Sequence, residues 1–326
     1  MSKKVLVVGG AGYIGSHMVK LLLGKQCSVV TLDNLSSGHR DAVLGGQFVH
    51  GDIADTALLG RLFAEHRFDA VMHFASYIQV GESVLKPAMY YQNNVANTLN
   101  LLQAMAVHKV PHFVFSSTAA TFGEPQAIPM DERHPQVPIN PYGKTKWMIE
   151  QALPDFEKAY GLTSVCLRYF NAAGAHPEGL LGERHDPETH LIPLVLQAAS
   201  GKREHISVFG TDYPTPDGTC IRDYIHVMDL CEAHWLALEH LWKGLPSQNF
   251  NLGNGTGFSV QEVINTARAV TGLPIEVKYA PRRAGDPASL VADSTQARSV
   301  LGWRPQYANL STIVEHAWRW ECAQSK

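Results

Sequence analysis

Three residues of this chain have the types and spacing needed for proton transfer. Tyr142 and Lys146 lie four positions apart, so on a helix they share one face. A phenol normally titrates at about pH 10. A nearby ammonium group stabilises the phenolate, which brings a tyrosine toward general-base catalysis at neutral pH. Thr118 follows the apolar run Phe113–Ser116, and we predict that its hydroxyl binds the substrate and shares a proton with Tyr142.

A pair with this spacing also occurs by chance on the surface of a helix, so its context matters. An earlier glycine-rich stretch supplies that context. Gly9, Gly12 and Gly15 follow the apolar run Val5–Val8 and precede a helical pattern. In a dinucleotide-binding turn, such glycines allow a sharp turn, approach of a pyrophosphate, and close packing of helix on strand. The helix N-terminus then favours phosphate, so we predict a cofactor site rather than an ordinary turn.

An acidic residue in the right place indicates which dinucleotide binds. The second apolar run, Ser28–Leu32, ends at Asp33, about 20 residues beyond the glycines. A carboxylate there accepts hydrogen bonds from the adenosine ribose and repels a 2′-phosphate, which favours NAD over NADP. Asp52 and Ile53 are expected at the adenine edge, and the backbone of Phe74, Ala75 and Ser76 is expected to pass close to the cofactor.

Strand-like and helix-like segments alternate through the first half of the chain. This order predicts an α/β fold, a Rossmann-type doubly wound parallel sheet with helices on both faces. Ligands of such sheets lie beyond the carboxyl ends of the strands, which is where the candidate residues fall. The expected strands are Val5–Val8, Val29–Leu32, Phe48–His50, Ala70–Phe74, Phe113–Ser116 and Ser164–Tyr169. The expected helices are Met18–Leu23, Ala57–Glu65, Pro87–Ala106 and Tyr142–Tyr160.

The composition of the chain changes after Asn171. A long loop of Gly, Pro, His and charged residues is expected from Gly174 to His190. We therefore divide the chain into residues 1–171, an NAD-binding domain that carries the catalytic residues, and residues 172–326, mainly a smaller C-terminal α/β substrate-binding lobe. Part of the second segment is expected to return to the sheet. Helices are expected at Pro193–Ser200 and Asp229–Leu241, short strands at Val208–Gly210 and Phe250–Leu252, and an extended segment at Gly218–Val227.

Composition excludes several classes of function. The 326 residues carry 27 basic and 30 acidic side chains, a net charge of −3, which gives no sign of a nucleic-acid partner. No apolar run has the length of a membrane helix or a signal peptide, so we predict a cytoplasmic protein with no membrane partner. Five scattered cysteines and sixteen histidines show no metal-ligand spacing. We expect no metal, and we interpret His176 and His185 as solvent-facing or structural.

The glycine motif, the Thr118 hydroxyl and the Tyr142–Lys146 pair, in this order, resemble the extended short-chain dehydrogenase/reductase superfamily. The chain is more closely similar to the UDP-glucose 4-epimerase family within it. The segments that carry this resemblance span nearly the whole chain: Gly9–His17, 33–35, 51–53, 73–75, 80–83, 90–95, 115–118, 141–146, 167–171, 218–229 and 282–286. The cofactor residues that the resemblance and the motifs imply are Gly9, Gly12, Tyr13, Ile14, Gly15, Asp33, Asn34, Ser36, Ser37, Gly38, Asp52, Ile53, Phe74, Ala75, Ser76, Asn93, Tyr142, Lys146 and Phe170.

The resemblance implies a reaction in which Tyr142 takes a proton from the sugar 4-hydroxyl while a hydride passes from C4 to bound NAD. The 4-keto sugar then turns over, and the hydride returns to its other face. It also implies a UDP-sugar partner and a homodimer, for which the helices at Pro87–Ala106 and Tyr142–Tyr160 are candidates. The implied substrate residues are Thr118, Tyr142, Asn171, His190, Leu191, Phe209, Arg222, Tyr224, Arg283, Asp286 and Leu290, with Arg222 and Arg283 on the diphosphate.

Two positions depart from the family pattern. Ile78 stands where many epimerases place a lysine near the nicotinamide ribose, which puts cofactor retention in question. Leu290 lies near the position that controls room for a 2-acetamido group, and its intermediate size leaves N-acetylhexosamines open as substrates. Such a change shifts selectivity by only about 1–3 kcal/mol.

Other functions fit less well. A 4,6-dehydratase needs an acid and a base after the threonine, and Ala119 and Ala120 can supply neither. A uronic-acid epimerase or decarboxylase needs extra groups for the carboxylate, for which there is no clear candidate. A plain reductase would release NADH, and a non-catalytic NAD-binding scaffold would tend to lose Tyr142 or Lys146. A 4-epimerase is therefore the expected function, with a dual-specificity epimerase as the alternative.

Overall fold

The computed structural model describes residues 2–283 and 286–324. Residues 284 and 285, inside the predicted segment 282–286, lie outside the described residues. In the described part, no helix is both long and apolar enough to cross a membrane.

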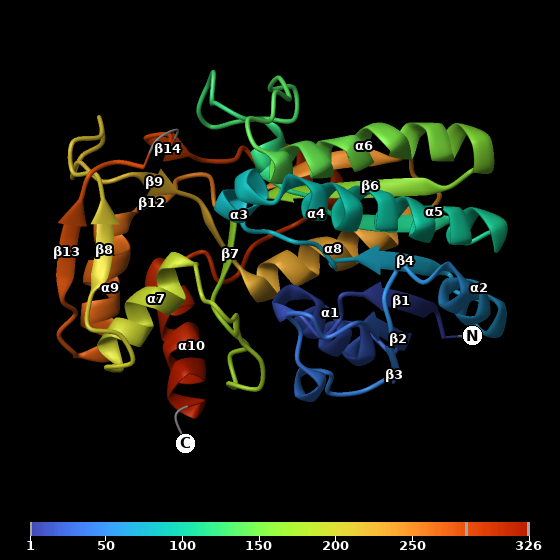
Figure 1. The fold of residues 1–326 in the computed structure, drawn as a ribbon, viewed down its shortest axis with the longest axis horizontal. Coiled ribbons are helices and arrows are strands. Elements are labelled where there is room, and N and C mark those ends of the chain that lie inside the picture. The colour runs from blue at the N-terminus through green and yellow to red at the C-terminus, as the bar shows by residue number, and fades with distance from the viewer. Residues whose placement is uncertain (1, 284–285, 325–326) are drawn as a thin grey trace.

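A seven-stranded parallel sheet forms the larger part of the molecule (Figure 1). Its strands stand in the order β11-β6-β5-β4-β1-β2-β3. Their apolar runs are buried on both faces, as expected of parallel strands covered by helices on each side. The bounds are β1 Lys4–Val8, β2 Ser28–Asp33, β3 Gln47–His50, β4 Ala70–His73, β5 His112–Ser116, β6 Thr163–Tyr169 and β11 Gln248–Leu252.

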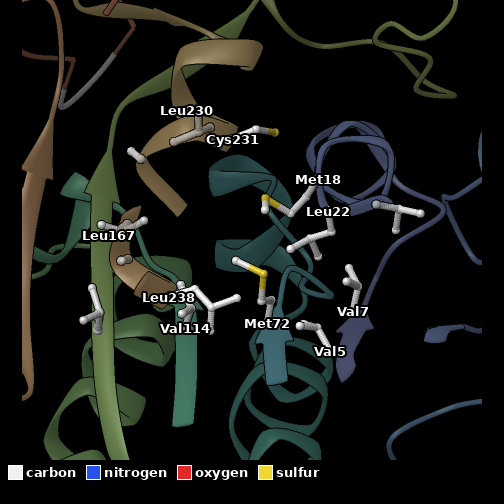
Figure 2. Packing of buried hydrophobic residues seen from close by; sticks show 14 of the residues in the cluster. Val5, Val7, Met18, Leu22, Met72, Val114, Leu167, Leu230, Cys231 and Leu238 are labelled. Atoms are coloured by element: carbon white, nitrogen blue, oxygen red, sulfur yellow. The ribbon is translucent and has the colours of Figure 1, made fainter. Parts of the chain in front are cut away.

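Helices cover both faces of this sheet. On one face, α1 (Tyr13–Gly24) and α8 (Val227–Trp242) pack against alternate residues of the strands. Figure 2 shows Met18 and Leu22 of α1, and Leu230 and Leu238 of α8, gathered over this face. On the other face lie α2 (Thr56–Glu65), α5 (Asn97–Val107) and α6 (Pro141–Tyr160). The two faces thus form two separate apolar clusters.

The strand order reverses at β1, which pairs with β2 on one side and β4 on the other. Ligands of open α/β sheets bind at such a switch point, outside the carboxyl ends of the strands. The loops after β1, β2 and β4 meet here, because parallel strands end at the same edge of the sheet. Two short helices, α3 (Val80–Leu85) and α4 (Pro87–Tyr91), follow β4, and a π-helical turn at Gln92–Ala96 joins α4 to α5.

A smaller lobe lies on the left in Figure 1, beyond the carboxyl edge of the sheet. Its core is formed by α7, α9 and α10 together with the two-stranded sheet of β8 and β13. Two further small sheets are formed by β7 with β10 and by β9 with β12 and β14. The bounds are β7 Asn171–Ala173, α7 Leu191–Ala199, β8 Ile206–Phe209, β9 Ile221–Arg222, β10 Tyr224–His226, β12 Phe258–Ser259, α9 Val260–Thr271, β13 Val277–Ala280, β14 Ser289–Leu290 and α10 Leu310–Ala323.

The predicted fold class is confirmed, with all six predicted strands in one parallel sheet. The predicted return of the chain is also observed, since β11 pairs with β6 and α8 packs on the large sheet. The boundary at residue 171 stays a prediction. The sequence reading did not predict α3, α9, α10 or β13, although Ser259 and Glu262 form a capping box at the start of α9.

Candidate active site

The glycine turn after β1 is built by close backbone packing. Gly9 has a φ of +80°, which suits glycine, and its N–H donates to the Leu32 carbonyl at 2.9 Å. A Cβ on Gly15 would lie 2.1 Å from the Gly9 carbonyl oxygen, and a Cβ on Gly9 would lie 2.4 Å from the Ala75 nitrogen. Gly12, at the N-cap of α1, meets nothing closer than 3.4 Å on that side. The turn therefore leaves open backbone at a helix N-terminus, which fits a pyrophosphate.

The loop after β2 is ordered around Asp33, which is 8% exposed. One carboxylate oxygen of Asp33 accepts from the Ala11 N–H at 2.9 Å, and the other accepts from the Leu35 N–H at 2.8 Å. Asn34 donates to Asp52 at 2.6 Å, which joins this loop to the loop after β3. Each carboxylate oxygen can accept a further bond, so Asp33 can still hold a ribose diol.

Tyr142 and Thr118 come together at the carboxyl end of β5. Thr118 accepts from the Ala120 N–H at 3.1 Å, and its hydroxyl hydrogen-bonds the Tyr142 phenol. Asn140 caps α6 by accepting from the Gly143 N–H at 2.8 Å, which fixes the start of the helix two residues before Tyr142. The predicted proximity of the two hydroxyls is thus observed.

Lys146, one turn further along α6, is buried. Its ammonium donates to the Ser116 carbonyl at 2.8 Å and lies 4.8 Å from the centroid of the Phe115 ring. Burial lowers the pKa of Lys146 to about 7, against the opposing attraction of Glu150. The lysine is therefore poised to change its charge near neutral pH.

In the protein alone, the pKa of the Tyr142 phenol lies above its ordinary value. Burial raises the pKa of Tyr142 to about 12, and only the hydrogen bond from Thr118 opposes this shift. Lowering the phenol pKa therefore requires the further positive charge that an oxidised nicotinamide supplies when bound.

A buried ion pair joins α6 to the neighbouring strand β6. Glu150 lies one turn after Lys146 and pairs with Arg168 of β6 at 2.5 Å. The same carboxylate accepts from the Ser117 hydroxyl at 2.5 Å and from Gln136 at 2.9 Å. The sequence reading missed Glu150, although its spacing from Lys146 places both on one helix face.

The π-helical turn at Gln92–Ala96 positions a second missed residue, Asn94. Its side chain bonds both backbone groups of Tyr77, at 2.9 and 3.0 Å, and donates to Thr145 at 3.1 Å. The predicted cofactor residue Asn93 donates to Asn94 at 2.9 Å. Such turns occur frequently at functional sites, and this one ties the loop after β4 to α6.

The remaining predicted cofactor residues lie at the same edge of the sheet. The N–H groups of Phe74 and Ala75 both donate to the Val8 carbonyl, at 2.8 and 3.2 Å, which keeps the loop after β4 beside the glycine turn. Tyr13 donates to the Gly174 carbonyl at 2.6 Å and so reaches the second half of the chain. The others occupy the loops after β2, β3, β4 and β6 or the start of α1: Ile14, Ser36, Ser37, Gly38, Ile53, Ser76 and Phe170.

The predicted diphosphate residues lie in the smaller lobe. Arg222 of β9 forms a short ion pair with Asp286. The guanidinium of Arg283 lies 4.0 Å from the centroid of the Phe209 ring in β8. The structure thus brings together Arg222 with Asp286, and Arg283 with Phe209.

The other predicted substrate residues divide into two groups. Leu290 is the β-sheet neighbour of Arg222, while Asn171 donates to the Asp223 carbonyl at 3.0 Å. Tyr224, in contrast, is 4% exposed in the apolar core of the smaller lobe. Leu191 opens α7 and also packs against that core.

His190 directs its Nδ1 at two glutamates rather than at open solvent. It lies 2.5 Å from Glu183 and 3.5 Å from Glu188, and these carboxylates raise the pKa of His190 to about 10. The same glutamates raise the pKa of His185 to about 9. The sequence predicts that His185 is solvent-facing or structural; its side chain is partly buried, at 20% exposure, and contacts both glutamates.

Comparison with known proteins defines the class. Residues 5–253 match the NAD dependent epimerase/dehydratase family. The chain is 58% identical over 316 residues to a UDP-glucose 4-epimerase of Halalkalibacterium halodurans, covering 97% of this chain and 95% of the relative. It is 52% identical over 325 residues to a UDP-glucose 4-epimerase of Rhizobium meliloti, covering 100% and 99%. The protein therefore belongs to the NAD-dependent epimerase/dehydratase family.

Within that family, the structural likeness is to UDP-glucose 4-epimerases. A crystal structure of the Brucella ovis UDP-glucose 4-epimerase in complex with NAD superposes with a TM-score of 0.96 at 50% identity, covering 97% of this chain and 98% of that one. The predictions of the resemblance, the Rossmann-type fold and the NAD-dependent enzyme are confirmed. The open glycine turn and the Asp33 carboxylate also fit NAD.

Proposed function

We propose that this protein is a UDP-glucose 4-epimerase, which interconverts UDP-galactose and UDP-glucose with bound NAD. The observation that carries the proposal is the cluster of Thr118, Tyr142 and Lys146 beside the glycine turn. The activity predicted from the sequence is confirmed by its full-length relatives, which are UDP-glucose 4-epimerases.

Bound NAD supplies a site that accepts a hydride from C4 of the sugar and returns it. The chain's own residues handle the proton. We propose that Tyr142 accepts the proton of the 4-hydroxyl at its phenolate oxygen while Thr118 donates a hydrogen bond to that oxygen. Lys146 holds a positive charge nearby, anchored by Ser116. After the 4-keto sugar has rotated in the site, Tyr142 returns the proton to the oxygen on C4 of the sugar.

Binding of the substrate is proposed to involve the smaller lobe. Arg222 can present its guanidinium to a diphosphate. The diphosphate would then compete with the Asp286 carboxylate for the N–H groups of Arg222. Phe209 can flank a uracil, and Arg283, whose guanidinium lies over the Phe209 ring, can present a second positive charge to the diphosphate. The deep burial of Tyr224 favours a supporting role behind this site over direct contact with the nucleotide.

We propose residues 1–171 with α8 and β11 as the NAD-binding domain, and the rest of the second half as the substrate lobe. We also propose a homodimer through the two predicted helical segments, 87–106 and α6, together with α3, which packs beside α6. The support is a set of exposed apolar residues on these helices, namely Val84, Leu85 and Met148 at 60, 82 and 43% exposure. The five cysteines are all free, which supports the proposal of a reducing, cytoplasmic compartment.

The test is to incubate purified protein, without added cofactor, with UDP-galactose and separately with UDP-N-acetylgalactosamine, and to follow C4 inversion by NMR. Conversion of UDP-galactose alone is the expected result. Conversion of both sugars would establish the dual-specificity alternative and a permissive pocket near Leu290. Net release of NADH would mean that the sugar is oxidised without return of the hydride, as in a dehydrogenase of the same superfamily, and no reaction even with added NAD would refute the proposal.

A further inference from the structure

Four side chains in the segment between β7 and α7 converge on one point. They are Glu183, His185, Glu188 and His190, all within eight residues of sequence. Each offers one donor atom, and the four donor atoms lie within 4.8 Å of one another. The proposed reaction gives no role to the first three, so the cluster needs its own explanation.

The two carboxylates of the cluster are shielded from solvent, whereas the His185 and His190 side chains are 20% and 38% exposed. The side chains of Glu183 and Glu188 are each 5% exposed, so two carboxylates are nearly buried side by side. Glu188 accepts the N–H groups of Thr189 and His190 at 2.7 and 2.8 Å on one oxygen. Among the described residues, the buried Oε1 of Glu183 and the Nδ1 atoms of His185 and His190 have no partner in hydrogen-bond geometry. Burial of such groups is costly unless something binds them.

The separations between donors suit a single small cation. Tetrahedral ligands at ordinary zinc distances lie about 3.3–3.5 Å apart. His185 Nδ1 lies 3.2 Å from Glu183 Oε1 and 3.6 Å from Glu188 Oε2, and His190 Nδ1 lies 3.5 Å from the other Glu188 oxygen, Oε1. The 2.5 Å separation between His190 Nδ1 and Glu183 Oε1 is well below this range and would have to widen by about 1 Å.

We propose that Glu183, His185, Glu188 and His190 together bind one divalent transition-metal ion of the zinc type. Imidazole nitrogen with carboxylate oxygen is a donor set that zinc accepts. The two carboxylates neutralise the charge of a divalent ion. A site closed by four protein ligands leaves no position for substrate, so the ion has a structural role.

The ion would fasten this segment against the cofactor turn. The Tyr13 ring lies edge-on to the His185 ring at 6.5 Å between centroids, and the Tyr13 hydroxyl donates to Gly174 at the start of the segment. His39, beside the predicted cofactor residue Gly38, contacts the Arg184 carbonyl at 3.1 Å. His190 is also the N-cap of α7, so the ion would join α7 to the same segment.

The test uses untagged full-length protein that has been treated with chelator, dialysed, and then titrated with Zn²⁺ alone. We expect about one tightly bound ion per chain by mass spectrometric metal analysis, and an unfolding temperature a few degrees higher with zinc. In Glu183→Gln and His185→Ala the bound metal should fall at least tenfold and the zinc-dependent shift should vanish.

His39→Ala is the matched control, because it removes a contact to the same segment and touches none of the four donors. It should keep the metal. Circular dichroism will establish that each variant is folded, and Glu183→Gln keeps the shape of the side chain. Three results would each overturn the proposal: no stoichiometric zinc on the wild type, equal zinc on wild type and variants, or zinc that leaves the unfolding temperature unchanged.

Discussion

The cofactor side and the sugar side of the site are built by different means. On the cofactor side, backbone packs on backbone, as at Gly15 against the Gly9 carbonyl, and Asp33 is held by two N–H groups. On the sugar side, Arg222 is held by the side chain of Asp286, and Arg283 lies exposed over Phe209. Rigid backbone suits a ligand that stays bound, whereas side-chain pairs that can be exchanged suit a ligand that comes and goes.

The largest effect on turnover should come from Tyr142, which is proposed to act on the sugar beside the bound cofactor. Tyr142→Phe removes the proton acceptor and should lower kcat by about 10²–10⁴-fold, while bound NAD stays at the wild-type level. Turnover by NMR and NAD released on denaturation measure the two quantities. Tyr160→Phe, at the exposed end of the same helix, is the control and should leave both unchanged. Normal turnover in Tyr142→Phe would exclude its assigned role.

A change in the backbone packing should break the cofactor side. Gly15→Ala places a Cβ 2.1 Å from the Gly9 carbonyl, so we expect a loss of about 1–3 kcal/mol in unfolding free energy and reduced NAD content. Gly60→Ala in α2 is the control, because nothing lies within 4 Å of its Cβ position. That variant should be about 0.4–1 kcal/mol more stable. Equal NAD content in both variants would contradict the packing argument.

Lys146 should give the cofactor side a characteristic pH dependence. Its pKa is about 7 in the fold and 10.5 as the reference value, so the unfolded chain binds more protons between these limits. Stability of the NAD-free protein should therefore rise with pH across that window, by at most about 1.4 kcal/mol per pH unit from this group. Lys146→Met should flatten the rise, measured by urea unfolding at several pH values. An unchanged slope would argue against a buried lysine with a lowered pKa.

A change on the sugar side should leave the cofactor in place. Arg222→Gln removes a charged partner of the diphosphate, so we expect KM for UDP-galactose to rise by about 10- to 150-fold, the equivalent of about 1.5–3 kcal/mol. NAD content should stay normal. Arg133→Gln is the control, because its ion pair with Asp131 is exposed. A fall in bound NAD with unchanged KM would reverse the assignment of the two sides.

The smallest effect concerns Ile78, which is 39% exposed. Ile78→Lys adds a charge where the family resemblance predicts a lysine, and it should slow NAD dissociation by less than about fivefold, because exposed charges contribute under about 1 kcal/mol. Val80→Lys, at a neighbouring exposed position, should have no effect on dissociation. Fluorescence of the released cofactor gives the rate. A tenfold change in the dissociation rate would contradict this prediction and would indicate direct contact between residue 78 and the cofactor.

The sequence predicts best what depends on local pattern. The apolar runs mark the strands, and strand ends and helix phase bring Asp33, Thr118, Tyr142 and Lys146 to one edge of the sheet. The pair of Arg222 and Asp286 joins residues 64 positions apart, which no periodicity indicates. The glutamates beside His185 and His190 were missed because only the path of an irregular segment brings them together. The short β8 and β13 likewise depend on each other as distant partners.

The place of β11 has a consequence for how the chain is made. β11 ends at Leu252, yet it is the outer neighbour of β6, which ends at Tyr169. During synthesis, one edge of β6 has no partner strand until more than 80 further residues, through the end of β11, have left the ribosome. Unpaired edges invite pairing with other chains, so the nascent protein carries its greatest hazard of aggregation in this interval. Segments of the two lobes alternate along the chain, so neither lobe can complete its folding before synthesis of the other has begun.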